Sequence, residues 1–204
     1  MRSPEGRTFC KSAAIVARFP IGAVLVKCLR MLPVAFHTTQ LELRQIGIGD
    51  AGPIFDTYAQ DPEVTRLLTW RPHQHLADTT AYIAGCVATS TRMARTYVVR
   101  EAGMVRGTVD MRMDEPYRLE VGYVLARSCW GRGLMTEALR EVADWALAQP
   151  RIFRIGAVCD VENIGAARVM EKAGFVREAL LRRWAIHPNV SDEPRDCFSY
   201  GRVR

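Results

Sequence analysis

The stretch from Glu120 to Thr136 constrains the fold of this chain more than any other. Leu119, Val121 and Tyr123 alternate with polar or small residues, which is the period-two pattern of a half-buried strand. After Gly133, apolar residues recur at the spacing of a helix that faces a core: Leu134, Ala138, Leu139, Val142, Trp145 and Ala146. The sequence therefore predicts a strand, a short loop and a helix that opens on two glycines.

The two glycines, Gly131 and Gly133, leave backbone N–H groups uncovered where the helix begins. The first turn of a helix has spare N–H donors and a partial positive charge, so it favours a phosphate group. Arg132 can add a charge-assisted contact from its side chain. No Gly-Lys-Ser/Thr follows, and Thr136 stands where a dinucleotide fingerprint has its third glycine, so neither of those phosphate motifs fits. A turn whose glycines serve only geometry is the remaining alternative.

Length and charge favour one globular domain. A chain of 204 residues with 49% apolar content can bury one substantial core. Residues 1–30 hold six basic side chains and one acidic one, so the formal net charge of +6 leaves only +1 for residues 31–204. A broad nucleic-acid-binding face is therefore not expected. We expect residues 1–30 to be a disordered extension, because Arg18 and Pro20 interrupt their apolar part, and residues 31–204 to be a single domain.

The cysteines and histidines do not predict a metal site. The six cysteines form no C-x-x-C pair, and the four histidines form no H-E-x-x-H arrangement. Unpaired cysteines in a chain of this size are typical of a reducing compartment. No segment has the length and apolarity of a membrane span. We therefore expect a soluble, cytoplasmic protein without a metal or a membrane partner, either a monomer or a homodimer.

The remaining patterns predict an α+β fold with a mixed sheet and helices on both of its faces. Asp50 and Asn163 are expected to cap helices, and the proline at position 72 makes residues 69–73 a loop. Strands are predicted at residues 41–46, 96–100, 105–113, 117–125, 152–159, 175–179, 181–187 and 197–203. Helices are predicted at residues 50–60, 62–68, 77–93 and 164–173, besides the helix that follows Gly133.

Three motifs, taken together, resemble the GNAT acetyltransferase superfamily. Residues 128–138, SCWGRGLMTEA, are similar to its motif A, and residues 163–175, NIGAARVMEKAGF, are similar to the helix that follows in the family. The segment EVGY at residues 120–123 resembles the branch of ribosomal-protein N-terminal acetyltransferases known as RimJ/RimL-like. The resemblance covers about residues 41–203 in order. It implies the acyl-CoA N-acyltransferase fold, with a central, mostly antiparallel, twisted sheet.

The resemblance also implies a cofactor, acetyl-CoA, and residues that bind it. The strand that ends at Val124 and Leu125 would splay from the strand at residues 152–159, and its free backbone groups would bind the pantetheine arm and polarise the acetyl carbonyl. Asn163 would contact the cofactor near the pantetheine, besides capping its helix. The pyrophosphate would be held by the backbone amides of Gly131, Arg132, Gly133, Leu134, Met135 and Thr136.

The chemistry implied is direct attack of a primary amine on the thioester, which requires a base for the ammonium proton and stabilisation of the oxyanion. Glu120 is the candidate base; its other interpretation is a solvated charge beside Arg118. Family members often have a Ser or a Tyr as acid for the leaving thiolate at the positions of Ala166 and Met170, so this chain departs from the family there. The candidates for contact with the acceptor are Trp70, Arg71, His73 and Tyr82, of which His73 is also a possible second base and Arg71 suits an acidic acceptor.

Two classes of function follow from these motifs. The preferred one is an N-acetyltransferase that acts on a protein N-terminus or a small-molecule amine. The alternative is a non-catalytic acyl-CoA sensor or interaction module that has kept the fold and lost its acid.

Overall fold

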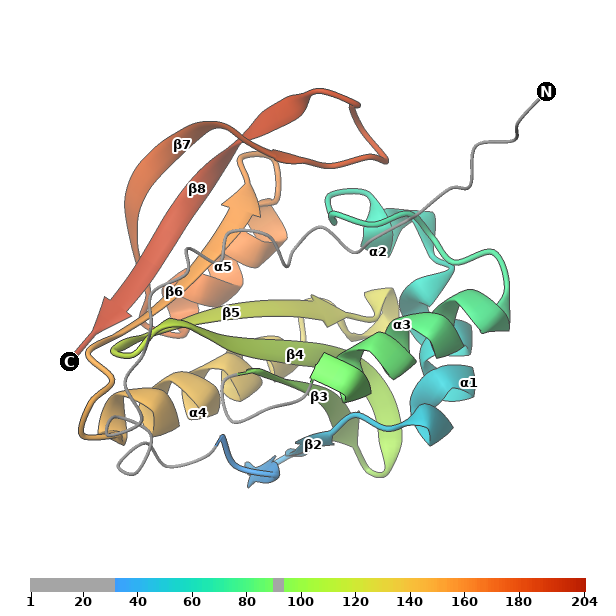
Figure 1. The fold of residues 1–204 in the computed structure, drawn as a ribbon, viewed down its shortest axis with the longest axis horizontal. Coiled ribbons are helices and arrows are strands. Elements are labelled where there is room, and N and C mark those ends of the chain that lie inside the picture. The colour runs from blue at the N-terminus through green and yellow to red at the C-terminus, as the bar shows by residue number, and fades with distance from the viewer. Residues whose placement is uncertain (1–31, 90–93) are drawn as a thin grey trace.

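The computed structural model of the protein describes residues 32–89 and 94–204, which build an eight-stranded sheet in the order β1-β2-β3-β4-β5-β6-β8-β7 (Figure 1). Among these neighbours only β5 and β6 run parallel, so the predicted, mostly antiparallel sheet is confirmed. The predicted extension at residues 1–30 lies outside the described residues. The strands are β1 (Ala35–His37), β2 (Leu41–Gln45), β3 (Ala94–Glu101), β4 (Met104–Glu115), β5 (Arg118–Leu125), β6 (Arg154–Asp160), β7 (Val176–Ile186) and β8 (Pro194–Val203).

Helices cover both faces of the sheet, as the sequence predicted. On one face lie α1 (Ala51–Ile54), which continues as a π-helical turn over Phe55–Ala59, then α2 (Pro62–Thr65) and α3 (Leu76–Thr89). On the other face lie α4 (Leu134–Ala148) and α5 (Ile164–Lys172). Two adjacent residues of β5 point to opposite faces of the sheet. Val124 lines a pocket beside α1 and α3, whereas the Tyr123 hydroxyl donates a hydrogen bond to the carbonyl of Ala166 in α5.

The core forms between α4 and the middle of the sheet. The apolar stripe of α4 is buried as its spacing predicted, except that Trp145 is only partly buried at the edge of the core. Tyr97, Val98 and Val99 in the central strand β3 are fully buried. Burying the side chains of one helix and one strand in this way is the main source of stability in such a layer packing.

Several elements differ from the prediction: the helix expected at residues 62–68 ends at Thr65, and the strand expected at residues 197–203 begins at Pro194. β1 was not predicted, because its three residues are too few to show a period-two pattern. The two strands predicted at residues 175–179 and 181–187 are one strand, β7, whose pairing with β8 is irregular between Leu181 and Ala185. Arg183 lies in this irregular part with a φ of 46°, a left-handed conformation that bends the strand without ending it.

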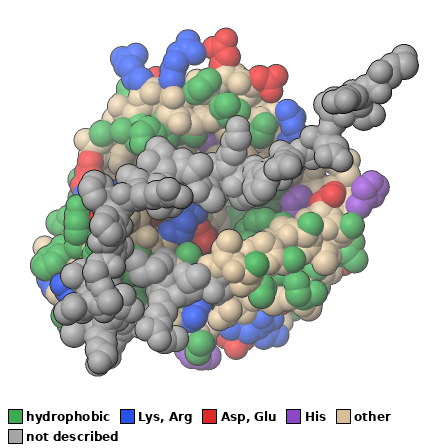
Figure 2. Space-filling view, in the orientation of Figure 1, with side chains coloured by type: hydrophobic (Ala, Val, Ile, Leu, Met, Phe, Trp, Pro, Cys, Tyr) green, Lys and Arg blue, Asp and Glu red, His purple; other side chains and the backbone are tan. Residues whose placement is uncertain are grey.

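The β7–β8 hairpin extends away from the rest of the sheet (Figure 1). Basic and acidic side chains gather at the top of the molecule, over this hairpin (Figure 2), and Arg183 and Glu193 form an ion pair there at 2.9 Å. Within the described residues, no helix is both long and apolar enough to cross a bilayer.

Candidate active site

The strands β5 and β6 diverge in the middle of the sheet. They pair at three positions, the last of which is Glu120 with Gly156, while β6 continues to pair with β8 as far as Asp160. From Val121 to Leu125, β5 therefore has strand pairing only on its β4 side. Backbone groups that no strand satisfies need another partner. The divergence leaves Val124 and Leu125 without a strand partner on the β6 side.

The loop before α4 presents a row of backbone donors. Gly131 and Gly133 have φ values of 75° and 80°, which favour glycine because a Cβ disfavours this left-handed conformation. Within the described residues, no acceptor faces the N–H groups of positions 131–136, and the first amide of this region with a partner is that of Glu137, bonded to the Gly133 carbonyl. These donors, at the positive end of a 15-residue helix, fit a pyrophosphate.

The side chains of the same segment have structural tasks. Leu134 and Met135 are buried and anchor the first turn of α4 in the core. Arg132 reaches sideways to the β3 strand end, where its two terminal nitrogens lie 3.1 and 2.6 Å from the carboxylate oxygens of Glu101. This pairing holds the pKa of Glu101 below its usual value. The N–H groups of positions 131–136, rather than the Arg132 side chain, are thus the part of this loop that has no partner among the described residues.

Asn163 lies where β6 ends and α5 begins. Its side-chain oxygen accepts a hydrogen bond from the Ala166 amide at 3.0 Å, so its role as a helix cap is present in the structure. The hydroxyl of Tyr123, which comes from the diverging part of β5, reaches the carbonyl of Ala166 at 2.9 Å. Burial raises the pKa of this phenol far above its ordinary value, so it stays protonated. The sequence alone does not single out Tyr123, because the alternation of its strand identifies it only as a half-buried strand residue.

Glu120 lies at the vertex of the divergence, on the face that carries Val124. An added Cβ on Gly156 would lie 3.0 Å from a Glu120 carboxylate oxygen, so the absent side chain of Gly156 makes room for the carboxylate. Burial, and then the charge of Asp114, raise the pKa of Glu120 above its ordinary value. Arg118, expected as its neighbour in the solvated interpretation, bonds instead to Asp114 at 2.8 Å. Arg112 pairs with Glu120 across the sheet, and the positive charges of Arg118, Arg112 and Arg154 partly offset the rise in its pKa. Among the described residues, however, no cation is bonded directly to this half-buried carboxyl group, so it has no dedicated cation.

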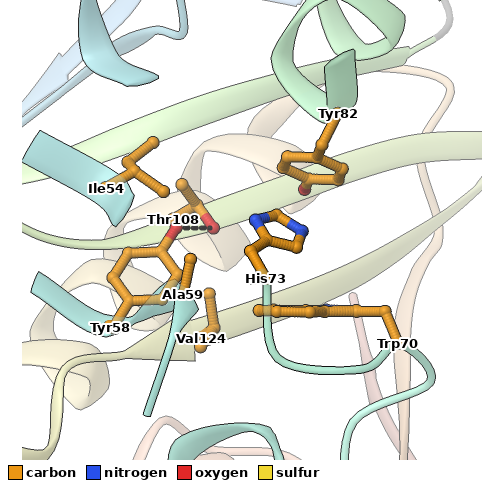
Figure 3. A pocket seen from close by; sticks show the side chains of 8 residues that line it. All are labelled: Ile54, Tyr58, Ala59, Trp70, His73, Tyr82, Thr108 and Val124. Carbon is orange, nitrogen blue, oxygen red and sulfur yellow. Dashed lines mark hydrogen bonds between the residues drawn. The ribbon is translucent and has the colours of Figure 1, made fainter. Parts of the chain in front are cut away.

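Three of the four candidate acceptor residues meet in one pocket (Figure 3). His73 has ring-centroid distances of 5.0 Å to Trp70 and 6.1 Å to Tyr82. The Nδ1 of His73 lies 2.7 Å from the hydroxyl of Thr79, and burial lowers the pKa of the imidazole, which favours its neutral form. Sequence reasoning had missed the other lining residues, Ile54, Tyr58, Ala59 and Thr108, because nothing in their local pattern distinguishes a pocket wall from a core.

Arg71 does not line this pocket. Its side chain is 66% exposed, and its guanidinium lies 3.6 Å from Asp192 in the loop between β7 and β8. The neighbouring segment around α2 forms ion pairs with the chain just after β5 and just after β6, the two strands that diverge. Arg127, just after β5, pairs with Asp61 at 2.9 Å, and Glu162, just after β6, pairs with Arg66 at 3.2 Å.

Asn189 adds a further tie from the β7–β8 loop. Its side-chain nitrogen donates to the carbonyls of Thr65 at 2.8 Å and Trp70 at 2.7 Å, so both amide hydrogens are used. The segment from Asp61 to Trp70 thus bridges the ends of β5 and β6 next to the pocket. Within residues 32–89 and 94–204, no group of three or more His, Cys, Asp or Glu side chains is arranged to hold a metal ion.

Comparison with known proteins identifies the family. Residues 40–176 match the acetyltransferase (GNAT) domain. An uncharacterized N-acetyltransferase p20 from Bacillus licheniformis is 29% identical over 151 residues, which cover 72% of this chain and 84% of that protein. This chain therefore belongs to the GNAT acetyltransferase family, and it is an acetyl-CoA-dependent N-acetyltransferase by class, as the motifs predicted.

Solved structures confirm the fold. RimL, the ribosomal L7/L12 alpha-N-protein acetyltransferase, in complex with coenzyme A, has a TM-score of 0.73 at 20% identity, over 85% of this chain and 98% of that one. Mycobacterium smegmatis RimJ in complex with CoA-disulfide has a TM-score of 0.71 at 20% identity, over 80% of this chain and 81% of that one. The predicted likeness to the RimJ/RimL-like branch is thus confirmed as a likeness of fold.

Proposed function

We propose that this protein transfers the acetyl group of acetyl-CoA to a primary amine, either a protein N-terminus or a small-molecule amine, by direct attack of the amine on the thioester. The observation that carries this proposal is the position of Glu120 at the vertex of the β5–β6 divergence, on the same face as the pocket residue Val124. A carboxyl group with a raised pKa and no dedicated cation can accept the ammonium proton, directly or through a water molecule.

The cofactor supplies the activated acetyl group, and this chain's residues bind and orient it. The amides of Gly131 to Thr136 would hold the pyrophosphate, and the backbone of Val124 and Leu125 would bind the pantetheine and polarise the carbonyl. Asn163 would contact the pantetheine while it caps α5. Val124 lines the acceptor pocket, and its backbone is also part of the proposed pantetheine site, so the two substrates would meet over β5.

The departing thiolate needs a hydrogen-bond donor, and we assign this task to Tyr123. Its phenol lies within the diverging part of β5 and reaches the backbone of Ala166, the position where relatives often have a hydroxyl. Because its pKa is raised so far, the phenol keeps its proton. In this structure the hydroxyl donates that proton to the Ala166 carbonyl, so it would have to turn from the carbonyl to the thiolate in order to stabilise the leaving group. The missing acid at Ala166 and Met170 favours a non-catalytic sensor, and a donor at Tyr123 would supply what those two positions lack.

The test uses the full chain, acetyl-CoA and a panel of primary amines, with release of the CoA thiol as the readout. A cofactor that binds only the native state stabilises it by about 2.7 kcal/mol at one hundred times its dissociation constant. We expect this stabilisation and thiol release with at least one amine, with turnover lowered by Glu120→Gln. Stabilisation without thiol release would support the acyl-CoA sensor instead. No stabilisation at millimolar acetyl-CoA would contradict both functions.

A further inference from the structure

The acceptor pocket has no charged residue in its lining. Its hydroxyl groups largely satisfy one another, since Tyr58 donates to Thr108 at 3.3 Å, and its one titratable ring, His73, favours the neutral form. A carboxylate or ammonium group placed here would lose its hydration without gaining a partner. The group that the pocket takes is therefore uncharged and largely apolar.

The rings of the pocket favour a flat group. Trp70 and Tyr82 are nearly parallel, with an angle of 24° between their planes and 6.5 Å between their centroids. His73 points toward the space between them in Figure 3, but its centroid distances of 5.0 and 6.1 Å are too long for a ring on the line that joins the two centroids. His73 therefore borders this space. A flat ring between Trp70 and Tyr82 needs a spacing of about 7 Å, made of two van der Waals contacts of about 3.5 Å each, and the centroids are 6.5 Å apart, so the ring enters only when the two side chains move apart.

The neighbouring surface of the sheet provides a site for the amine. Thr108 of the pocket pairs with Val124, and the next residues on the same face are Asp110, which pairs with Gly122, and then Arg112, which pairs with Glu120 and whose guanidinium lies 2.6 Å from the Asp110 carboxylate. A Cβ on Gly122 would meet nothing within 4 Å, so the space above it is open. An ammonium group there would lie near the carboxylate of Glu120, whereas the carboxylate of Asp110 is already paired with Arg112. Two residues along a strand span about 6.6 Å, which sets the distance from this site to the pocket.

Resting on the proposed acetyltransferase function, we infer that the acceptor is a primary amine joined through two or three atoms to a flat, uncharged, unsaturated ring. The α-amine of an aromatic amino acid derivative, or of a peptide that begins with an aromatic residue, has this geometry. Arg71, the residue that suited an acidic acceptor, is turned toward Asp192 and away from the pocket lining.

The experiment compares 2-phenylethylamine and phenylalaninamide with butylamine and spermidine, as acceptors for the full chain with acetyl-CoA. We expect kcat/KM for the two aromatic amines to exceed that for the others by at least about tenfold, because aromatic contacts add to ordinary burial. Trp70→Ala is expected to bring this ratio toward one. Trp184→Ala, which removes a tryptophan that is 58% exposed on β7, is the matched control and should leave the ratio unchanged.

Equal kcat/KM values for aromatic and aliphatic amines, or a ratio that Trp70→Ala does not change, would overturn the inference. Failure of the proposed function looks different, because no amine would then release CoA. In that case calorimetric titration of the CoA-loaded protein decides. Binding of 2-phenylethylamine at least about tenfold tighter than that of butylamine, weakened by Trp70→Ala, supports the aromatic site, and equal binding refutes it.

Discussion

The substitution Gly107→Ala tests whether the backbone of β5 at Val124 is placed for function. Gly107 lies in β4 opposite Leu125, and an added Cβ would stand 2.1 Å from the carbonyl oxygen of Val124 and 3.1 Å from the Cα of Leu125. Ordinary contacts begin at about 3.4 Å, so the two strands must move apart by more than about 1 Å at this point. The contacting atoms belong to the backbone, so no side-chain rotation can relieve the clash.

Two effects follow from this movement, and both are measurable. Overpacking that shifts backbone costs about 1–3 kcal/mol, which for a chain of this size lowers the unfolding temperature by about 2–12 °C. Because a misplacement of 1 Å can cost about a hundredfold in rate, we expect kcat to fall by about that factor. Circular dichroism measures the unfolding temperature, and release of the CoA thiol with an amine that the wild-type enzyme acetylates measures kcat.

The control is Gly122→Ala in the neighbouring strand. A Cβ there meets nothing within 4 Å, so we expect its free energy of unfolding to change by less than about 1 kcal/mol. If Gly107→Ala unfolds at the wild-type temperature and retains wild-type turnover, the close approach of β4 to Val124 is irrelevant, and the reasoning fails.

Three further predictions concern the residues around the divergence. Glu120→Gln should lower kcat/KM by about 10²–10⁴ and remove the acidic limb of the pH profile. The raised pKa of Glu120 means that the fold disfavours its charged form, so the stability of the wild-type protein falls as pH rises above the ordinary pKa of 4.5. Glu120→Gln should therefore also unfold at a higher temperature than wild type at pH 7. Gly133→Ala should cost about 1–2 kcal/mol, because its φ is 80°, and should weaken acetyl-CoA binding in calorimetry, whereas an unchanged dissociation constant would argue against the amide cradle. Asn189→Ala should raise KM for the amine several-fold while leaving KM for acetyl-CoA unchanged, because it frees the carbonyls of Thr65 and Trp70 beside the pocket; an equal rise in both constants would indicate a general loss of structure.

The sequence predicted the features that depend on local pattern. The strand, the loop and the helix around Gly131 and Gly133 follow from two periodicities and from two residues that tolerate a positive φ. The meeting of Trp70, His73 and Tyr82 was also expected, because they lie near one another along the chain.

Contacts between distant segments were not predictable in the same way. The bonds from Asn189 to the Trp70 loop join residues 119 or more positions apart, and no local preference encodes them. The same holds for Arg132, whose pairing with Glu101 depends on where the β3–β4 turn lies relative to α4. Tyr123 looked like an ordinary buried strand residue until the tertiary packing placed its hydroxyl beside α5.

The order of the strands also has a consequence for how the protein folds. From β2 to β5 each paired neighbour in the sheet is the next strand in the sequence, and the β3–β4 and β4–β5 connections are short turns, so much of this half can form through local contacts, which are quick to find. Within the described sheet, the only strand pairing between the two halves is the short parallel pairing of β5 with β6, which forms after the chain has crossed by way of α4. Closing that longer loop is the slower event. The proposed reactive centre lies at this junction, so gain of enzymatic activity during refolding should follow, and never precede, formation of the antiparallel half.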